Sequence, residues 1–218
     1  MKTAYWAYKN LGRVTGVRLL KELKGESAKD PGKELTVKKM ISTARMFGRQ
    51  VQNIHDIKEA VASYTSKAAE KLRRQKSAAN TISVFVVAKE EGHKIDFNRG
   101  ITTSKYDTLP VATSATHKLI KPAVQLVDAL FEKGKSCKKA GVMLSGLVPD
   151  ENIQGNLFVE EKHNGKRMLM DMPDNVNFAM RDDLIKFAAS GTKCDWKMRM
   201  EMGIPRYTTR WEELYQVK

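Results

Sequence analysis

The fold is decided by residues 54–88, IHDIKEAVASYTSKAAEKLRRQKSAANTISVFVVA, where a helix pattern passes into a strand pattern. Apolar side chains recur every three or four residues in its first part, at Ile54, Ile57, Val61, Tyr64, Ala68 and Leu72. This spacing predicts an amphipathic helix over 54–76. Asn53 is a suitable N-cap, and basic residues fill the last turn, where cations interact favourably with the helix dipole. The β-branched run at 80–88 then predicts a strand.

The flanking sequence supplies the remaining elements of a domain. They are strands over 37–45, 101–113 and 137–144 and a second helix over 115–133. Pro122 falls within this second helix, which therefore either starts near Lys121 or is kinked there. The order is strand, helix, strand, strand, helix, strand, which is the split βαβ arrangement of the α+β class. It stacks two helices on one face of a four-stranded sheet and leaves the other face open.

Basic and hydroxyl side chains on the predicted strands are the candidates to line this open face. They are Lys38, Ser42, Arg45, Ser83, Thr103, Lys105, Lys138 and Lys139. Both kinds of side chain suit a phosphate backbone, because phosphate oxygens accept hydrogen bonds from each of them. Ordinary solvated positions are the alternative interpretation for about half of the set.

The positive charge is concentrated in one part of the chain. The 218 residues carry 39 Lys and Arg against 25 Asp and Glu, and the whole excess of 14 lies within residues 1–150. A local excess of this size attracts polyanions. Nucleic acid is the leading candidate, because binding to Lys and Arg releases its condensed counterions. A basic surface without a partner is the alternative.

The composition and motifs exclude several other classes. No apolar stretch approaches the ~20 residues of a membrane helix, and the N-terminal residues hold no signal-peptide core. Cys137 and Cys194 form no CxxC pair, so we expect neither a disulfide scaffold nor a zinc site, in a cytoplasmic protein. Neighbouring carboxylates such as Asp182 and Asp183 diverge, and no nucleotide-binding or nucleophile motif occurs. We therefore expect a binding module without a catalytic site.

The segments that flank this domain differ from it in character. Residues 11–25 predict a short helix, and 25–33 predict a linker because Asp-Pro-Gly signals a turn. Residues 145–165 are polar and extended in character. Seven of the 11 methionines lie between 168 and 202, where we expect a mostly helical and irregular C-terminal extension over 166–218.

Four segments resemble a known family. They are MISTARMFGRQV (40–51), YTSKAAEKLRRQ (64–75), KKAGVMLSGL (138–147) and WKMRMEMGIPRYTTRW (196–211). In this order they resemble the C-terminal half of Y-family translesion DNA polymerases of the UmuC (ImpB/MucB/SamB) type, and RYTTR is quite specific to that branch. The resemblance implies the following parts: the end of the thumb and a linker over 1–36, the DNA-binding little finger over 37–146, a linker with a clamp-binding motif over 147–165, and the branch-specific extension over 166–218.

The resemblance also implies which residues touch DNA, because in that family the open sheet of the little finger lies in the major groove against the primer–template backbone. The best candidates are Ser42, Thr43, Arg45 and Arg49, then Lys138 and Lys139, and Lys38, Thr103 and Lys105 complete the set. The palm, with the carboxylates that bind Mg²⁺, is missing, so we expect no cofactor in this chain and no polymerisation by it alone. The implied role is damage bypass in SOS mutagenesis, with an accessory subunit of the UmuD type.

Residues 154–158, QGNLF, resemble the sliding-clamp-binding peptide of bacterial polymerases, at the place where this family carries one. Gln154 would hydrogen-bond at the mouth of a cleft on the clamp, while Leu157 and Phe158 would fill an apolar pocket. Gly155 departs from the Leu that is common at its position, which removes an apolar contact. The resemblance thus implies two partners, primer–template DNA and the bacterial sliding clamp, and no membrane.

A stand-alone split βαβ module that binds RNA or the ribosome is the alternative function. RNA-recognition sheets of this topology stack bases on aromatic side chains of their strands. The predicted strand at 80–88 offers only Phe85, and the one at 137–144 offers no aromatic residue. This pattern counts against the alternative.

Overall fold

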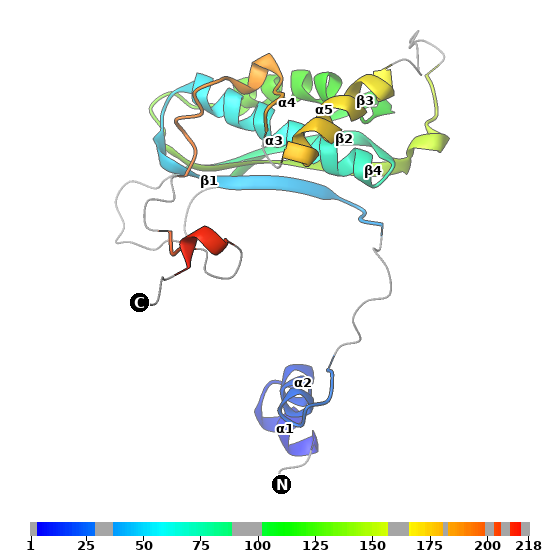
Figure 1. The fold of residues 1–218 in the computed structure, drawn as a ribbon, viewed down its shortest axis with the longest axis vertical. Coiled ribbons are helices and arrows are strands. Elements are labelled where there is room, and N and C mark those ends of the chain that lie inside the picture. The colour runs from blue at the N-terminus through cyan, green and yellow to red at the C-terminus, as the bar shows by residue number, and fades with distance from the viewer. Residues whose placement is uncertain are drawn as a thin grey trace. The chain divides into compact units, whose positions relative to one another are not determined.

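The structure is a computed structural model that describes residues 4–28, 37–88, 102–156, 166–180, 183–198, 203–205 and 210–214. The chain divides into two compact units, Met1–Lys38 and Lys39–Lys218. Figure 1 traces the helices and strands of each unit.

The first unit is a pair of short helices, α1 (Ala4–Asn10) and α2 (Val14–Leu23). Left-handed backbone at Gly12 and Arg13, with φ of 85° and 54°, separates the two helices. Gly16 lies where the helices touch, and a Cβ atom on it would come within 2.8 Å of the Leu11 Cβ. Only glycine permits this close approach. The helix predicted over 11–25 is confirmed as α2, whereas α1 has no counterpart in the prediction.

The second unit is built on a four-stranded antiparallel sheet. Its strands are β1 (Ile41–Val51), β2 (Ser77–Ala88), β3 (Thr102–Thr113) and β4 (Cys137–Pro149), and its long helices are α3 (Ile54–Arg74) and α4 (Thr116–Leu130). The strand order is β1-β4-β2-β3, with β1 and β3 at the edges. Each β-α-β crossover therefore joins parallel strands that have a third strand between them. The predicted split βαβ fold is confirmed, with both helices on one face of the sheet (Figure 1).

The elements differ from the prediction mainly at their ends. β1 begins at Ile41 rather than at residue 37, and residues 37–40 are exposed coil. β2 and β4 are longer than predicted because they pair from Ser77 opposite Pro149 along nearly their whole length. α4 runs through Pro122, so the helix does not begin near Lys121.

The core lies between the sheet and the helices. Side chains of β2 and β4 meet there from directly opposite positions, Ile82 with Leu144 and Val84 with Val142, and all four are fully buried. Burial of each such side chain contributes about 1.5–3 kcal/mol. From α3, the predicted apolar stripe packs against them through residues that include Ile57, Val61, Tyr64, Ala68 and Leu72.

The C-terminal part of the chain adds α5 (Lys166–Met180) and three 3₁₀ turns, Asp150–Asn152, Ala188–Ser190 and Trp211–Glu213. Trp196 is only 2% exposed and belongs to the core. Its ring lies edge-on to Phe47 of β1 and to Tyr64 of α3, with centroids 6.3 and 5.6 Å apart. The Gly48 N–H donates to the Trp196 carbonyl oxygen at 3.0 Å. Residues 183–198 are therefore part of the same compact unit as the sheet.

A buried ion pair joins α5 to α3. The Arg73 side chain is 4% exposed and donates from Nε and Nη2 to the two carboxylate oxygens of Asp174, at 2.6 and 2.8 Å. Its Nη1 donates to the Ser114 carbonyl oxygen at 2.7 Å and to Thr116 Oγ1 at 2.9 Å. The guanidinium is thus satisfied on three sides, and removing Asp174 would leave a buried charge without its counterion.

Candidate nucleic-acid interface

The face of the sheet that α3 and α4 leave uncovered is identified from the strand register. Successive side chains of a strand point to opposite faces, and on β2 both Ile82 and Val84 are buried beneath the helices. Ser83 and Phe85 therefore point to the open face, as do the residues directly opposite them. By this pairing the open face consists of Ser42, Ala44 and Met46 of β1, Thr81, Ser83, Phe85 and Val87 of β2, Thr102, Ser104, Tyr106 and Thr108 of β3, and Lys139, Gly141, Met143 and Ser145 of β4.

Hydroxyl groups are the main polar feature of this open face. Eight of its fifteen residues carry one, and the four on β3 are all exposed. Among the strand residues whose pairing the structure fixes, Lys139 alone brings a cation to this face. The face can therefore donate many hydrogen bonds to an acceptor such as phosphate while carrying little positive charge.

At the centre of the open face, Gly141 leaves room for an aromatic ring. A Cβ atom on Gly141 would lie 2.5 Å from the Ala44 Cβ and 2.6 Å from Phe85 Cε1, so the ring occupies the space of the missing side chain. The Lys139 ammonium lies 5.8 Å from the centroid of the Phe85 ring, within the range of a cation–π contact. Tyr106, on edge strand β3, is 74% exposed.

Two of the β1 residues predicted to contact DNA lie on the side opposite the open face. Thr43 is 7% exposed and accepts a hydrogen bond from Lys71 Nζ of α3 at 3.4 Å. Arg45 pairs with Ala140, which is fully buried on the helix side, and lines a groove there with residues of α3. The prediction that Ser42, Thr43 and Arg45 share a face is wrong, because side chains an odd number of positions apart on a regular strand point in opposite directions.

The same error applies to two predicted residues of β3. Thr103 and Lys105 are directly opposite Val86 and Val84, which belong to the helix-covered core. Lys105 Nζ donates to the Ala129 carbonyl oxygen at the end of α4, at 2.8 Å. The hydroxyls that do reach the open face from this strand are those of their neighbours, which the sequence prediction missed because the pairing of Phe85 with Ser104 is set by the register of the sheet.

Of the remaining predicted residues, three lie together on the open face and three lie elsewhere. Ser42, Ser83 and Lys139 lie together on the open face, as predicted. Lys138 is half-buried at a register irregularity of β4, and Arg49, near the end of β1, is exposed with its Nη2 3.7 Å from the Asp56 carboxylate. Lys38 precedes β1 and falls in the first unit.

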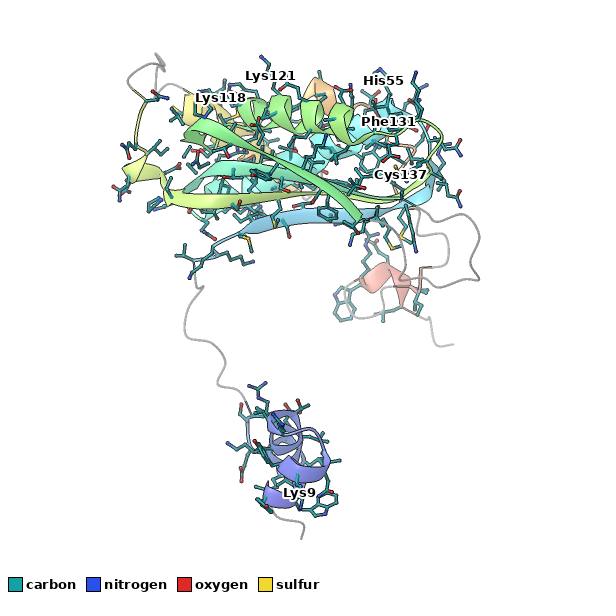
Figure 2. The ribbon with its side chains drawn as sticks, turned by 180° about the vertical axis from the view of Figure 1, so that it is seen from behind. Lys9, His55, Lys118, Lys121, Phe131 and Cys137 are labelled. Carbon is teal, nitrogen blue, oxygen red and sulfur yellow. The ribbon has the colours of Figure 1, made fainter. Side chains whose placement is uncertain are left out.

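Other basic residues lie on the helix side of the sheet. Lys118 and Lys121 project from α4 in Figure 2. They cannot contact a ligand that is bound flat on the open face. These two lysines therefore act on such a ligand only at a distance, through an electrostatic field that raises the rate of encounter.

The segment predicted to bind a sliding clamp is described only in part. Gln154 is exposed and follows the 3₁₀ turn Asp150–Asn152. Leu157 and Phe158, the two predicted anchors, lie outside the described residues.

Burial shifts the pKa values of two side chains on the covered side. It raises the pKa of Tyr64 to about 12, with the Arg45 guanidinium acting in the opposite direction. It also raises the pKa of the Cys137 thiol, which is buried in the core. Across the described residues, no cluster of three or more His, Cys, Asp or Glu side chains is placed to hold a metal ion. No helix in the described part of the chain is both long and apolar enough to cross a membrane.

The fold defines the class of the second unit, an α+β domain of split βαβ topology with one uncovered sheet face. Residues 38–157 match the impB/mucB/samB family C-terminal domain. The chain belongs to this family, which confirms the resemblance read from the sequence. Residues 167–217 match a second family model, a domain of unknown function named DUF4113.

Curated relatives agree with this assignment. Protein UmuC of Salmonella typhimurium strain LT2 is 31% identical over 214 residues, which are 98% of this chain and 50% of that protein. Protein SamB of Salmonella typhimurium is 31% identical over 92% of this chain and 47% of its own length, and Protein MucB of Escherichia coli is 30% identical over 90% and 46%. The chain spans about half the length of these relatives.

Two solved structures are distantly similar to this chain. The insertion ternary complex of Dbh DNA polymerase is 15% identical, with a TM-score of 0.42 over 67% of this chain and 39% of that one. DinB from Sulfolobus solfataricus is 14% identical, with a TM-score of 0.41 over 68% and 39%. Likenesses this weak add nothing to the family assignment.

Proposed function

We propose that this chain is the non-catalytic, DNA-gripping C-terminal part of a Y-family translesion DNA polymerase, and that it holds the primer–template through the open face of its sheet. The observation that carries the proposal is the uncovered, hydroxyl-lined sheet face within the segment that matches the family's C-terminal domain. DNA damage bypass is the activity of the whole polymerase to which such a part would belong.

Contacts of this kind position DNA without reading its sequence. Hydroxyls such as those of Ser42 and Ser83 donate to phosphate oxygens, and Lys139 supplies a charge-assisted contact. None of these groups selects a base when it binds the backbone. Binding that does not depend on the bases suits a polymerase that must continue across damaged templates.

The proposal includes a tether to the sliding clamp. Gln154 is exposed at the end of the described domain, where a following peptide can reach a partner. Leu157 and Phe158 are proposed as its anchors, because a few buried apolar side chains supply most of the affinity of such peptides. An accessory subunit of the UmuD type remains part of the proposal through family resemblance alone.

A second candidate function is binding of single-stranded RNA or DNA by base stacking. The observation in its favour is that Phe85 and Tyr106 both lie on the open face, so the sheet offers two rings rather than one. Aromatic side chains stack on unpaired bases. Family membership favours the polymerase role over this alternative.

The proposed grip is tested by comparing the two faces of the same strands. Fluorescence anisotropy would measure binding of the 218-residue chain to a labelled primer–template duplex over a range of salt concentrations. We expect Ser42→Ala/Ser83→Ala/Lys139→Ala to weaken binding about tenfold or more, since each lost hydrogen bond costs about 0.5–1.5 kcal/mol. The slope of log K against log salt should fall by about 0.9, one phosphate contact.

The matched control changes the covered side of the sheet. Thr103→Val/Lys105→Ala removes one hydroxyl and the same charge from β3, and we expect it to leave affinity within about twofold and to change the salt slope little. Equal losses in the two variants would mean that net charge, and not the open face, binds the duplex.

A further inference from the structure

A groove of about 470 Å³ lies between α3 and the C-terminal segment, on the side of the sheet away from the proposed DNA face. Its apolar walls include Pro173, Ile185, Phe187 and Met198. The volume falls within the range of about 300–1,000 Å³ that is usual for ligand-binding pockets. Both matched families contribute to it, because α3 belongs to the impB/mucB/samB domain and Pro173 through Met198 belong to the domain of unknown function.

The uncompensated charge around this groove is positive. Its carboxylates are all paired, Asp174 with Arg73, Asp183 with Lys67 at 2.8 Å and Glu70 with Arg74 at 2.6 Å. Three further lining residues are exposed cations that form no ion pair with any other described residue, namely Arg45, Lys186 and Lys197. The rim therefore attracts an anionic ligand and has no free carboxylate of its own, within the described residues, to repel it.

Two buried donors in the wall of the groove have no acceptor. Tyr64 and Trp196 are each 2% exposed, and the Tyr64 hydroxyl and the Trp196 Nε1–H lack a hydrogen-bond partner among the described residues. A buried polar group without a partner costs about 1–3 kcal/mol. An acceptor group brought into the groove, with a small movement of its wall, would relieve that cost.

We propose that this groove binds an acidic peptide segment of a partner protein, with an aromatic or leucine side chain as its anchor. The anchor enters between Ile185 and Phe187, the peptide carboxylates meet the three rim cations, and a peptide carbonyl or carboxylate offers the missing acceptor. The domain of unknown function thereby completes a recognition site that the little finger lacks by itself.

The test is binding of a fluorescein-labelled peptide, Glu-Glu-Phe-Leu-Glu-Glu, to the 218-residue chain in moderate salt, followed by anisotropy. We expect saturable binding that Arg45→Ala/Lys186→Ala weakens at least fivefold. The same peptide with Ser-Ser in place of Phe-Leu should bind at least fivefold more weakly. The matched control is Arg49→Ala/Lys193→Ala, which removes the same charge from positions outside the groove and should leave peptide affinity within twofold.

Circular dichroism would check that each variant is folded. Lys186→Glu provides a second groove variant, at an exposed position where the substitution cannot disturb packing. The proposal is overturned if no variant changes peptide affinity, if the serine peptide binds equally, or if the control variant weakens binding as much as the groove variant. Sedimentation that shows a dimer in the wild type but not in Arg45→Ala/Lys186→Ala, without peptide binding, would assign the groove to a second copy and would also overturn it. Retained duplex-DNA affinity in the groove variants would separate this site from the proposed DNA face.

Discussion

The two faces of the sheet divide the same four strands between them. On the covered face, Ile82 and Val84 of β2 and their partners on β4, Leu144 and Val142, are fully buried and form one wall of the core. On the open face, the intervening residues are mostly hydroxyls around the Phe85 ring. Neighbours in the sequence therefore have unrelated roles, whereas residues two positions apart share one. The predictions below test this division, beginning with the largest expected effect.

The first prediction tests whether the core of the covered face includes the C-terminal segment. Trp196→Ala removes a ring that packs between Phe47 and Tyr64, so we expect a loss of about 3–5 kcal/mol in the free energy of unfolding. Urea unfolding followed by circular dichroism measures it. Trp211→Ala is the control, because Trp211 is 89% exposed and its removal should change stability by no more than about 0.5 kcal/mol. Similar small effects for both would separate residues 183–198 from the core.

The second prediction concerns the polar link on the covered side. Asp174→Ala leaves the buried Arg73 guanidinium without its counterion, and we expect a loss of about 2–3 kcal/mol, since the Asp174 side chain itself is partly exposed. Asp183→Ala breaks the more exposed pair with Lys67 and should cost less than about 1 kcal/mol. Denaturant unfolding of both variants measures the two losses in the free energy of unfolding under the same conditions. A larger loss for Asp183→Ala would contradict the ranking by burial.

The third prediction is a dependence of stability on pH. Burial raises the pKa of Tyr64 to about 12 from its ordinary 10.0, so the folded state favours the neutral phenol. This contribution is complete below pH 10 and is lost as the pH rises through about 12, by up to about 3 kcal/mol. Tyr64→Phe should remove that part of the alkaline loss.

At neutral pH we expect Tyr64→Phe to be neutral or slightly stabilising, because the hydroxyl it removes has no partner among the described residues. Urea midpoints at pH 8, 10 and 11.5 compare the variant with the wild type. An identical alkaline loss in both proteins would show that Tyr64 is not its source.

The smallest predicted effect distinguishes the two uses of the open face. Tyr106→Ser keeps a hydroxyl and removes the ring, so we expect duplex affinity to change by less than about twofold if the face grips the backbone. If the face stacks bases instead, affinity for single-stranded DNA should fall by about 1–3 kcal/mol. Anisotropy with matched duplex and single-stranded oligonucleotides measures both. Tyr106→Phe, which keeps the ring, serves as the control for stacking.

The order of the elements could be predicted from the sequence because hydrophobic periodicity is local. The helix period from Ile54 to Leu72 and the β-branched run at 80–88 each fix an element without reference to the rest of the chain. The faces were predicted less well, because choosing residues by chemical type placed Arg45, Thr103 and Lys105 on the wrong side. The family resemblance did the same for Thr43. Alternation along each strand is the stronger constraint.

The role of Trp196 could not be predicted in the same way. It lies far along the chain from Phe47 and Tyr64, outside any periodic segment, and only tertiary packing brings the three rings together. The groove beside them depends on the same long-range packing. Its cations come from a strand and from an irregular segment, and no spacing in the sequence relates the two.

The hydrogen bond from Gly48 to the Trp196 carbonyl has a consequence for how this protein can be shortened. β1 is an edge strand, and unpaired edges are templates on which other chains add strands. Here the C-terminal segment occupies one backbone donor of that edge, and its tryptophan packs on the Phe47 ring beside it. A version cut before residue 183 would keep every strand of the sheet and lose this cover. We therefore expect the truncated protein to aggregate while it is still folded. The cause would be strand addition at the uncovered edge of β1 and not unfolding of the domain.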